Sequence, residues 1–188
     1  MLVVLKTIKK IKYLIILLVL GLSNRSNMKE IYNFSIQSDK KEWRIVNDDV
    51  MGGISKSSLV LTDAGHGQFS GHVSLANNGG FASIQLNTKI KLAEEKTFVV
   101  LRVKGDGKNY EFRMKGSISQ SESYVHQFST SGEWESIKLE INEFYPQYRG
   151  RKMNIPNFNF ESIEQLSFLI ANKQDEDFEL LIDWIGLE

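Results

Sequence analysis

The sequence predicts an all-β fold, an antiparallel β-sandwich or jelly roll. Most of the chain consists of short runs in which apolar and polar residues alternate, the period of a strand with one buried face. Clusters of Gly, Asn and Asp separate these runs, as turns require. The chain of 188 residues has only two prolines, and the one suspected helical turn lies around residues 38–42. About eleven strands punctuated in this way favour two packed sheets.

The expected strands can be given in chain order. They cover residues 31–34, 43–46, 57–61, 68–75, 81–86, 97–103, 109–114, 124–128, 134–139, 165–170 and 178–185. The clearest turn signals between them are Asp63-Ala64-Gly65, Asn78-Gly79-Gly80, Asp106-Gly107 and Ser131-Gly132. Residues 142–162 do not alternate, so we expect a long loop there, and such loops are uncommon unless they are functional.

The first 27 residues differ from the rest of the chain. They carry five basic residues and no acidic one, with an apolar run of ten residues from Tyr13 to Leu22. A spanning helix needs about 20 residues, so the pattern indicates a secretory signal peptide or a short membrane anchor. We therefore expect an exported or membrane-anchored protein, with the cytoplasmic face left open. Residues 28–188 are expected to form a single β-sandwich domain.

Charge and cysteine content restrict the partners. Residues 28–188 hold 23 acidic and 18 basic side chains, a formal charge of −5. Nucleic-acid binding needs clustered Lys and Arg, so this acidic domain argues against it. The absence of cysteine excludes disulfides and thiolate metal sites, and it fits either an oxidising or a reducing compartment.

The stretch from Trp43 to Ser55 reads W-R-I-V-N-D-D-V-M-G-G-I-S. Two alternating runs flank a Gly-Gly pair, which predicts a β-hairpin over residues 43–61. Its tip gathers Asp48, Asp49, Met51, Gly52 and Gly53. The residues alone leave two interpretations open, a solvated tight turn and a contact surface.

The motif W-x-x-V-N-D-D-V-M-G-G-x-S resembles the signature of the complex I intermediate-associated protein family, assembly factors for NADH:ubiquinone oxidoreductase. Later segments fit the same pattern in order: F-S-G-H-V-S-L, N-N-G-G-F-A-S-I, V-K-G-D-G-K-N-Y, F-Y-P-Q-Y-R-G-R and F-L-I-A-N-K-Q. The resemblance implies a galactose-binding-like sandwich. It also implies a non-catalytic, chaperone-like module that binds another protein, such as a subunit of a respiratory complex. Members from mitochondria carry presequences rich in Arg and Ser, whereas this chain begins with Lys, Leu and Ile.

Two surfaces are candidates for binding. The first joins the 48–53 tip to the Asn78–Phe81 turn and the Arg149–Arg151 loop, as a protein contact. The second follows from strand parity, which puts Phe81, Gln85, Arg113 and Trp134 on one face; a sugar could lie there, so a carbohydrate-binding module is the alternative. The candidate binding residues are Asp48, Asp49, Met51, Gly52, Gly53, Asn78, Gly80, Phe81, Trp134, Arg149 and Arg151.

Signs of catalysis are weak. Asp48 and Asp49 are adjacent, so in a strand their side chains point to opposite faces and cannot form a glycosidase pair. There is no G-x-S-x-G elbow and no cysteine nucleophile. A structural calcium held by these carboxylates with Asp183 stays an open possibility. We expect a non-enzyme without a cofactor.

Overall fold

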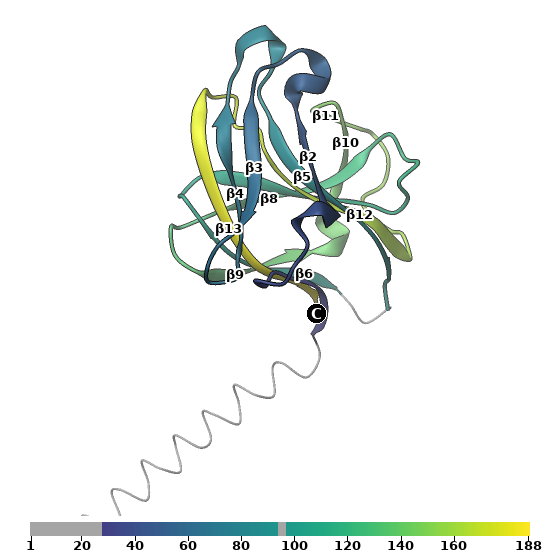
Figure 1. The fold of residues 1–188 in the computed structure, drawn as a ribbon. Coiled ribbons are helices and arrows are strands. Elements are labelled where there is room, and N and C mark those ends of the chain that lie inside the picture. The colour runs from purple at the N-terminus through teal and green to yellow at the C-terminus, as the bar shows by residue number, and fades with distance from the viewer. Residues whose placement is uncertain (1–27, 94–96) are drawn as a thin grey trace, which may run out of the picture.

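The protein is a sandwich of two antiparallel sheets, which confirms the predicted fold class (Figure 1). The computed structural model describes residues 28–93 and 97–188, without the side chains of Lys40, Val50 and Met51. The proposed signal or anchor, residues 1–27, lies outside this part of the chain. No helix in the described ranges is long and apolar enough to cross a membrane.

The first sheet has the strand order β3-β4-β13-β6-β9, and β1 also pairs with β13. The long final strand β13, drawn in yellow in Figure 1, runs through its centre. Its members are β1 (Lys29–Asn33), β3 (Lys56–Leu61), β4 (Gly67–Val73), β6 (Phe98–Gly105), β9 (Glu135–Glu140) and β13 (Glu176–Leu187).

The second sheet has the order β11-β10-β8-β7-β12-β5-β2. Its members are β2 (Trp43–Asn47), β5 (Ala82–Lys91), β7 (Asn109–Lys115), β8 (Ser123–Ser129), β10 (Tyr145–Tyr148), β11 (Arg151–Lys152) and β12 (Ser162–Ile170). Single 3₁₀ turns occupy η1 (Lys40–Glu42), η2 (Asp48–Met51), η3 (Ala76–Asn78) and η4 (Ile141–Glu143).

The core lies between the two sheets and is rich in aromatic rings. Tyr110, Phe112 and Met114, which alternate along β7, are buried, as strand parity predicts. The Phe112 and Phe168 rings meet edge to face with centroids 5.0 Å apart. Burial of such rings supplies a large share of the hydrophobic stabilisation in a domain of this size.

The predicted hairpin over residues 43–61 is wrong. β2 pairs with β5 in the second sheet, whereas β3 pairs with β4 in the first. Between them, η2 is followed by Gly52, whose φ of 89° lies in the left-handed region, and the chain crosses to the other sheet. The Asp106-Gly107 turn does the same, because β6 and β7 belong to different sheets. Both glycine turns therefore connect the two sheets and do not close hairpins.

The expected long loop at residues 142–162 also needs correction. It contains β10 and β11, which pair as Gln147↔Lys152 and Tyr148↔Arg151. Arg149 and Gly150 form the two-residue tip between them, with φ of 47° and 73°. Positive φ at both central positions is what a tight type I′ hairpin turn requires. The segment is thus a short hairpin at the edge of the second sheet followed by irregular chain.

Candidate binding site

Asp48 is the hub of a buried hydrogen-bond network. Its carboxylate accepts bonds from the Ser55 amide at 2.9 Å, the Gly80 amide at 2.6 Å and the Phe81 amide at 3.3 Å. The Ser55 hydroxyl also donates to it. The side chain is 1% exposed. Burial raises the pKa of this carboxyl, but the four bonds outweigh that effect and hold its pKa below the usual value.

Two glycines allow the network to close. A Cβ at Gly53 would overlap the Asp48 carboxylate, and a Cβ at Gly79 would stand 2.6 Å from Asp48 Oδ2 and 2.7 Å from the Ser74 carbonyl oxygen. Real side chains do not approach so closely, so both positions need glycine for space. The Asp48–Gly53 segment and the Gly79–Phe81 segment, some thirty residues apart in sequence, are thereby fixed to one another.

This geometry corrects the expected role of Asp48. The sequence suggested that it contacts a partner, but its oxygens face donors inside the protein. Its neighbour Asp49 is exposed, as is Gly52, whereas Gly53 is buried. The Met51 side chain lies outside the described residues, so its proposed contact stays a prediction.

A pocket of about 370 Å³ opens on the outward face of the second sheet, beside the Asp48 network. We call it the Phe81 pocket. Its lining residues are Val46, Asn78, Gly79, Gly80, Phe81, Ser83, Gln85, Arg113, Arg149, Gly150, Leu169 and Ala171. The pocket brings together Asn78, Gly80, Phe81 and Arg149, which the sequence analysis selected from two separate segments. Its volume falls within the usual range of ligand pockets, about 300–1,000 Å³.

Strand register explains the pocket's shape. Ser83 pairs with Val46 on one side and Leu169 on the other, so these three side chains share the outward face. Ser83 is small and Leu169 is buried, which leaves a hollow with a partly apolar floor. The Asp48 network holds the Phe81 backbone at one wall, and Arg149 stands at another.

Polar side chains on β2, β5 and β7 occupy the neighbouring positions on this outward face of the second sheet. Arg44 donates to Gln85 Oε1 at 2.9 Å. Arg113 donates from Nε to Glu111 Oε2 at 2.8 Å and from Nη2 to Gln147 Oε1 at 2.8 Å. The Arg113 bond to Gln147 connects β7 to β10 and so supports the hairpin that carries Arg149.

Arg149 and Arg151 differ in position. Arg149 lines the pocket, and its guanidinium lies 5.4 Å from the centroid of the Tyr148 ring, a cation–π distance. Arg151 is exposed on β11 and does not line the pocket. The left-handed backbone conformation costs a non-glycine residue roughly 1–2 kcal/mol of conformational free energy, so the conformation of Arg149 is locally disfavoured.

Trp134 does not share a face with Phe81, which corrects the expected sugar platform. Its ring lies 4.6 Å from that of His66, and the Arg102 guanidinium stands 5.7 Å from its centroid. Arg102 belongs to β6, in the first sheet. Parity along each strand was read correctly, but it does not show which sheet a strand joins. Phe81, Gln85 and Arg113 do line one pocket.

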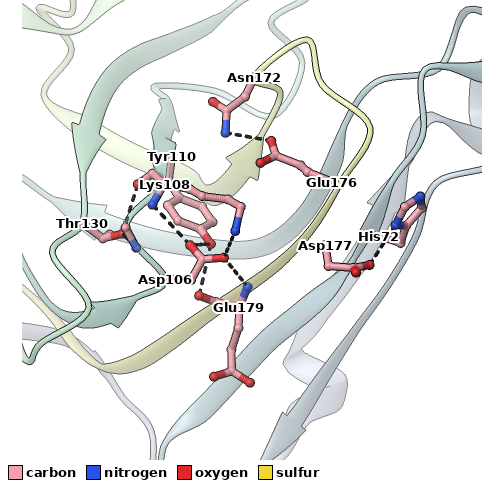
Figure 2. Close-up of polar contacts among 10 residues, drawn as sticks. His72, Asp106, Lys108, Tyr110, Thr130, Asn172, Glu176, Asp177 and Glu179 are labelled. Carbon is pink, nitrogen blue, oxygen red and sulfur yellow. Dashed lines mark hydrogen bonds and ion pairs between the residues drawn. The ribbon is translucent and has the colours of Figure 1, made fainter.

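Two further polar clusters involve strand β13 (Figure 2). Asp106 accepts bonds from Lys108 Nζ at 2.7 Å, from the Tyr110 hydroxyl at 2.9 Å and from the Glu179 amide at 3.0 Å. Burial raises the pKa of Asp106, but these donors outweigh it and lower the pKa overall. The cluster fastens the Asp106-Gly107 turn to β13.

His72 forms the other cluster. Its Nδ1 lies 2.8 Å from Asp177 Oδ1, and its Nε2 lies 3.0 Å from Asp175 Oδ1. The bond to Asp177 raises the pKa of His72, and the charges of both carboxylates add to the effect. This His72 clasp joins β4 to Asp177 on the adjacent strand β13 and to Asp175 in the connection that precedes β13.

The geometry around the predicted calcium ligands does not suit a cation. N–H and O–H groups point hydrogens at the buried Asp48 oxygens, so the surroundings of this carboxylate suit an anion and not a cation. Asp183 instead lies 3.4 Å from His66 Nδ1. Within the described ranges no group of three or more His, Cys, Asp or Glu is placed to hold a metal ion.

The model of the family "Complex I intermediate-associated protein 30 (CIA30)" matches residues 32–182. The chain belongs to this family. The match covers both sheets, the Asp48 network and every residue that lines the Phe81 pocket.

Curated relatives carry the same family name. A Caenorhabditis elegans protein named "probable complex I intermediate-associated protein 30, mitochondrial" is 28% identical over 89% of this chain and 56% of its own length. The mouse protein named "complex I intermediate-associated protein 30, mitochondrial" is 20% identical over 84% of this chain and 55% of its own length. The chain thus spans about half the length of these relatives. Because they are named as mitochondrial, the expectation of an exported or membrane-anchored protein is wrong.

The solved structures share the fold. A family 11 carbohydrate-binding module from Clostridium thermocellum, in complex with a β-1,3-1,4-mixed-linked tetrasaccharide, has a TM-score of 0.62. It is 13% identical and is matched over 85% of this chain and 94% of its own length. At this identity the likeness establishes the jelly-roll sandwich and nothing about ligand.

Sequence reasoning missed several residues of the pocket. Val46, Leu169 and Ala171 were not selected, and Gln85 and Arg113 were noted only for their parity. A signal was present, because alternation assigns Leu169 to the face opposite the buried Phe168 and Ile170. An apolar residue at an outward position of a central strand indicates a covered or recessed surface.

Proposed function

We propose that this domain is a non-catalytic protein-binding module of the complex I assembly-factor type, and that it holds a partner protein at the Phe81 pocket. The family and the names of the relatives support the class of function. The observation that carries the site is the Phe81 pocket itself, where two loops from distant parts of the sequence meet over a partly apolar floor.

The arrangement suits recognition of a protein segment. Phe81 offers a half-buried aromatic ring and Arg149 an exposed guanidinium, and aromatic and Arg side chains are enriched at protein interfaces. Gly79 and Gly80 present backbone without a side chain, so a partner can approach closely. Asp48 acts as a positioning residue, because it fixes Gly80 and Phe81 through their amides.

Affinity purification of the tagged full-length protein from mitochondria of its own cells tests the proposal. We expect subunits of NADH:ubiquinone oxidoreductase to copurify with the wild type and to be lost with Phe81→Ala. Trp134→Ala is the matched control, since it also removes a half-buried aromatic side chain, but on the other sheet. Equal recovery with both variants, or no recovery with the wild type, would contradict the proposal.

A glycan is the second candidate for the same pocket. The Phe81 ring lies beside Asn78, Gln85 and two arginines, a combination of an aromatic face with hydrogen-bonding groups that can hold a sugar. Isothermal titration with a mixed-linkage β-glucan tetrasaccharide decides this point. A saturable heat of binding that disappears in Phe81→Ala would favour the glycan as the ligand. A titration without binding heat would contradict this candidate.

A further inference from the structure

Four non-glycine residues in the described part of the chain have positive φ. They are Asn77 at 56°, Asn78 at 60°, Arg149 at 47° and Lys173 at 59°. Asn tolerates the left-handed region, whereas Arg and Lys are disfavoured there. Asn78 and Arg149 line the Phe81 pocket, and Lys173 lines a hollow next to it. The disfavoured backbone therefore gathers around one surface.

Arg149 occupies a position that suits asparagine. It is the first of two central residues in the β10–β11 turn, and Gly150 is the second. Asn-Gly is the preferred pair for a turn with two positive φ values. Having Arg there brings an exposed cation to the pocket wall. Among the described residues, no carboxylate forms an ion pair with it.

Lys173 also combines a positive φ with an exposed cationic side chain, in a hollow next to the Phe81 pocket. It is exposed in the connection between β12 and β13. With Glu111, Gln127 and Asn172 it lines a hollow of about 170 Å³. Ala171 lines both this hollow and the Phe81 pocket, so the two adjoin. We call the combined surface the Phe81–Lys173 groove.

The charge of this groove is opposite to that of the domain. Its lining holds Arg113, Arg149 and Lys173 against a single carboxylate, Glu111. Glu111 is already bonded to Arg113, which leaves Arg149 and Lys173 as the uncompensated charges. Residues 28–188 carry a formal charge of −5, so a positive groove on this surface is a local feature.

We propose that the Phe81–Lys173 groove binds an acidic peptide segment of the partner protein, with one carboxylate at Arg149 and another at Lys173. This inference rests on the proposed function and specifies the chemistry of its partner. An Arg guanidinium binds a carboxylate through two parallel hydrogen bonds, and a Lys ammonium pairs with it as a point charge. The apolar floor at Leu169 and the Phe81 ring would hold side chains between the two.

The charges favour a peptide over a polyanion. A nucleic acid or anionic membrane meets many cations at once, whereas this groove offers two uncompensated ones. Glu111 and the acidic remainder of the domain would repel a dense negative charge. Single carboxylates spaced along a chain match the two separate cations better.

Selection from a display library of random linear peptides, against the immobilised full-length protein, tests the inference. We expect the selected peptides to be enriched in Asp and Glu relative to Lys and Arg. The enrichment should disappear when the double variant Arg149→Asn/Lys173→Asn is used. Selection of neutral or basic peptides by the wild type, or of none, would overturn the inference.

Asparagine is the informative replacement because it removes the charge while suiting the left-handed backbone. Each single variant should weaken binding of a selected peptide about tenfold, the scale of one charge-assisted bond. The melting temperature should stay equal or rise. Arg151→Asn is the matched control: it removes the same charge two residues away, outside the groove, and should leave affinity unchanged. If Arg151→Asn weakened peptide binding equally, the inference would be overturned, because the effect would then come from the net charge of the domain and not from contacts in the groove.

The outcomes separate this inference from the proposed function. Peptides that are not acidic but lose binding in Phe81→Ala would keep the pocket as a protein-binding site and overturn only the acidic preference. Acidic peptides selected by a protein that recovers no NADH:ubiquinone oxidoreductase subunit would overturn the proposed function and leave the inference standing.

Discussion

Replacing Asp48 with asparagine should strongly destabilise the protein. The buried carboxylate accepts hydrogen bonds from three backbone amides and one hydroxyl: Oδ1 from the Ser55 amide, and Oδ2 from the Ser55 hydroxyl and the Gly80 and Phe81 amides. An amide can keep an acceptor on only one of these sides, and on the other its NH₂ group meets donors. Hydrogen bonds to charged groups contribute about 1.5–3 kcal/mol each. With the amide oxygen kept at the Oδ2 position, the bond from the Ser55 amide is lost and the other three lose the carboxylate charge, which together should lower the free energy of unfolding by about 3–5 kcal/mol.

Urea denaturation of the full-length protein measures this change. Asp63→Asn is the control, since it removes the same charge at an exposed position and should shift the free energy of unfolding by less than about 0.5 kcal/mol. A loss below about 1 kcal/mol in Asp48→Asn would refute the reasoning, because the carboxylate would then not organise the two loops.

The same residue predicts an acid dependence. The folded-state pKa of Asp48 lies below its unfolded value, so protonation favours the unfolded chain. Its contribution is fully present above the unfolded pKa of about 3.9 and is lost as the pH falls through the lower folded pKa. Between wild type and Asp48→Asn, the difference in melting temperature should therefore shrink in acid. A difference that stays constant down to about pH 2 would contradict this assignment.

Three other predictions test the contacts around the site. Gly79→Ala should lower the free energy of unfolding by about 1–3 kcal/mol in urea denaturation, because its Cβ would meet Asp48 and the Ser74 carbonyl; an unchanged midpoint would contradict the close packing. Tyr110→Phe should lower the free energy of unfolding by about 1–2 kcal/mol, since the Tyr110 hydroxyl lies 2.9 Å from Asp106 Oδ1 and 3.1 Å from the Glu179 carbonyl oxygen. An unchanged free energy of unfolding would contradict a stabilising role of this hydroxyl. The pKa of His72 is raised in the folded state, so its ion pairs stabilise the protein below the unfolded pKa, and this stabilisation is lost as the pH rises through the folded pKa. The melting temperature of the wild type, compared with that of His72→Gln, should therefore increase as the pH is lowered from about 8 to about 6. A difference between the two melting temperatures that does not change with pH would contradict the stabilising role of His72.

The fold class could be predicted because alternation along a strand directly reports which side chains face the core. Tyr110, Phe112 and Met114 follow this rule and are buried. The partner of a strand is a different matter, because a glycine turn looks the same whether the next strand stays in the sheet or crosses to the other. Gly52-Gly53 and Asp106-Gly107 both cross, and Trp134 was assigned to the wrong sheet for the same reason.

The loop residues that line the pocket could be predicted from the sequence, but the buried role of Asp48 could not. Phe81 and Arg149 were selected from composition and resemblance, and both line the pocket. Asp48 was expected at the surface, because a carboxylate is normally solvated. Its burial depends on amides that lie some thirty residues further along the chain, a relation that no local pattern contains.

Site-specific photo-crosslinking in the protein's own cells tests the central claim, that a partner protein binds at the Phe81 pocket. A photoreactive phenylalanine analogue is introduced at Phe81 in one variant and at Trp134 in another, so each exchange keeps an aromatic ring of similar exposure. The proposal predicts a crosslink to a subunit of NADH:ubiquinone oxidoreductase from position 81 and none from position 134. The same subunit captured from both positions, or only from position 134, would contradict it.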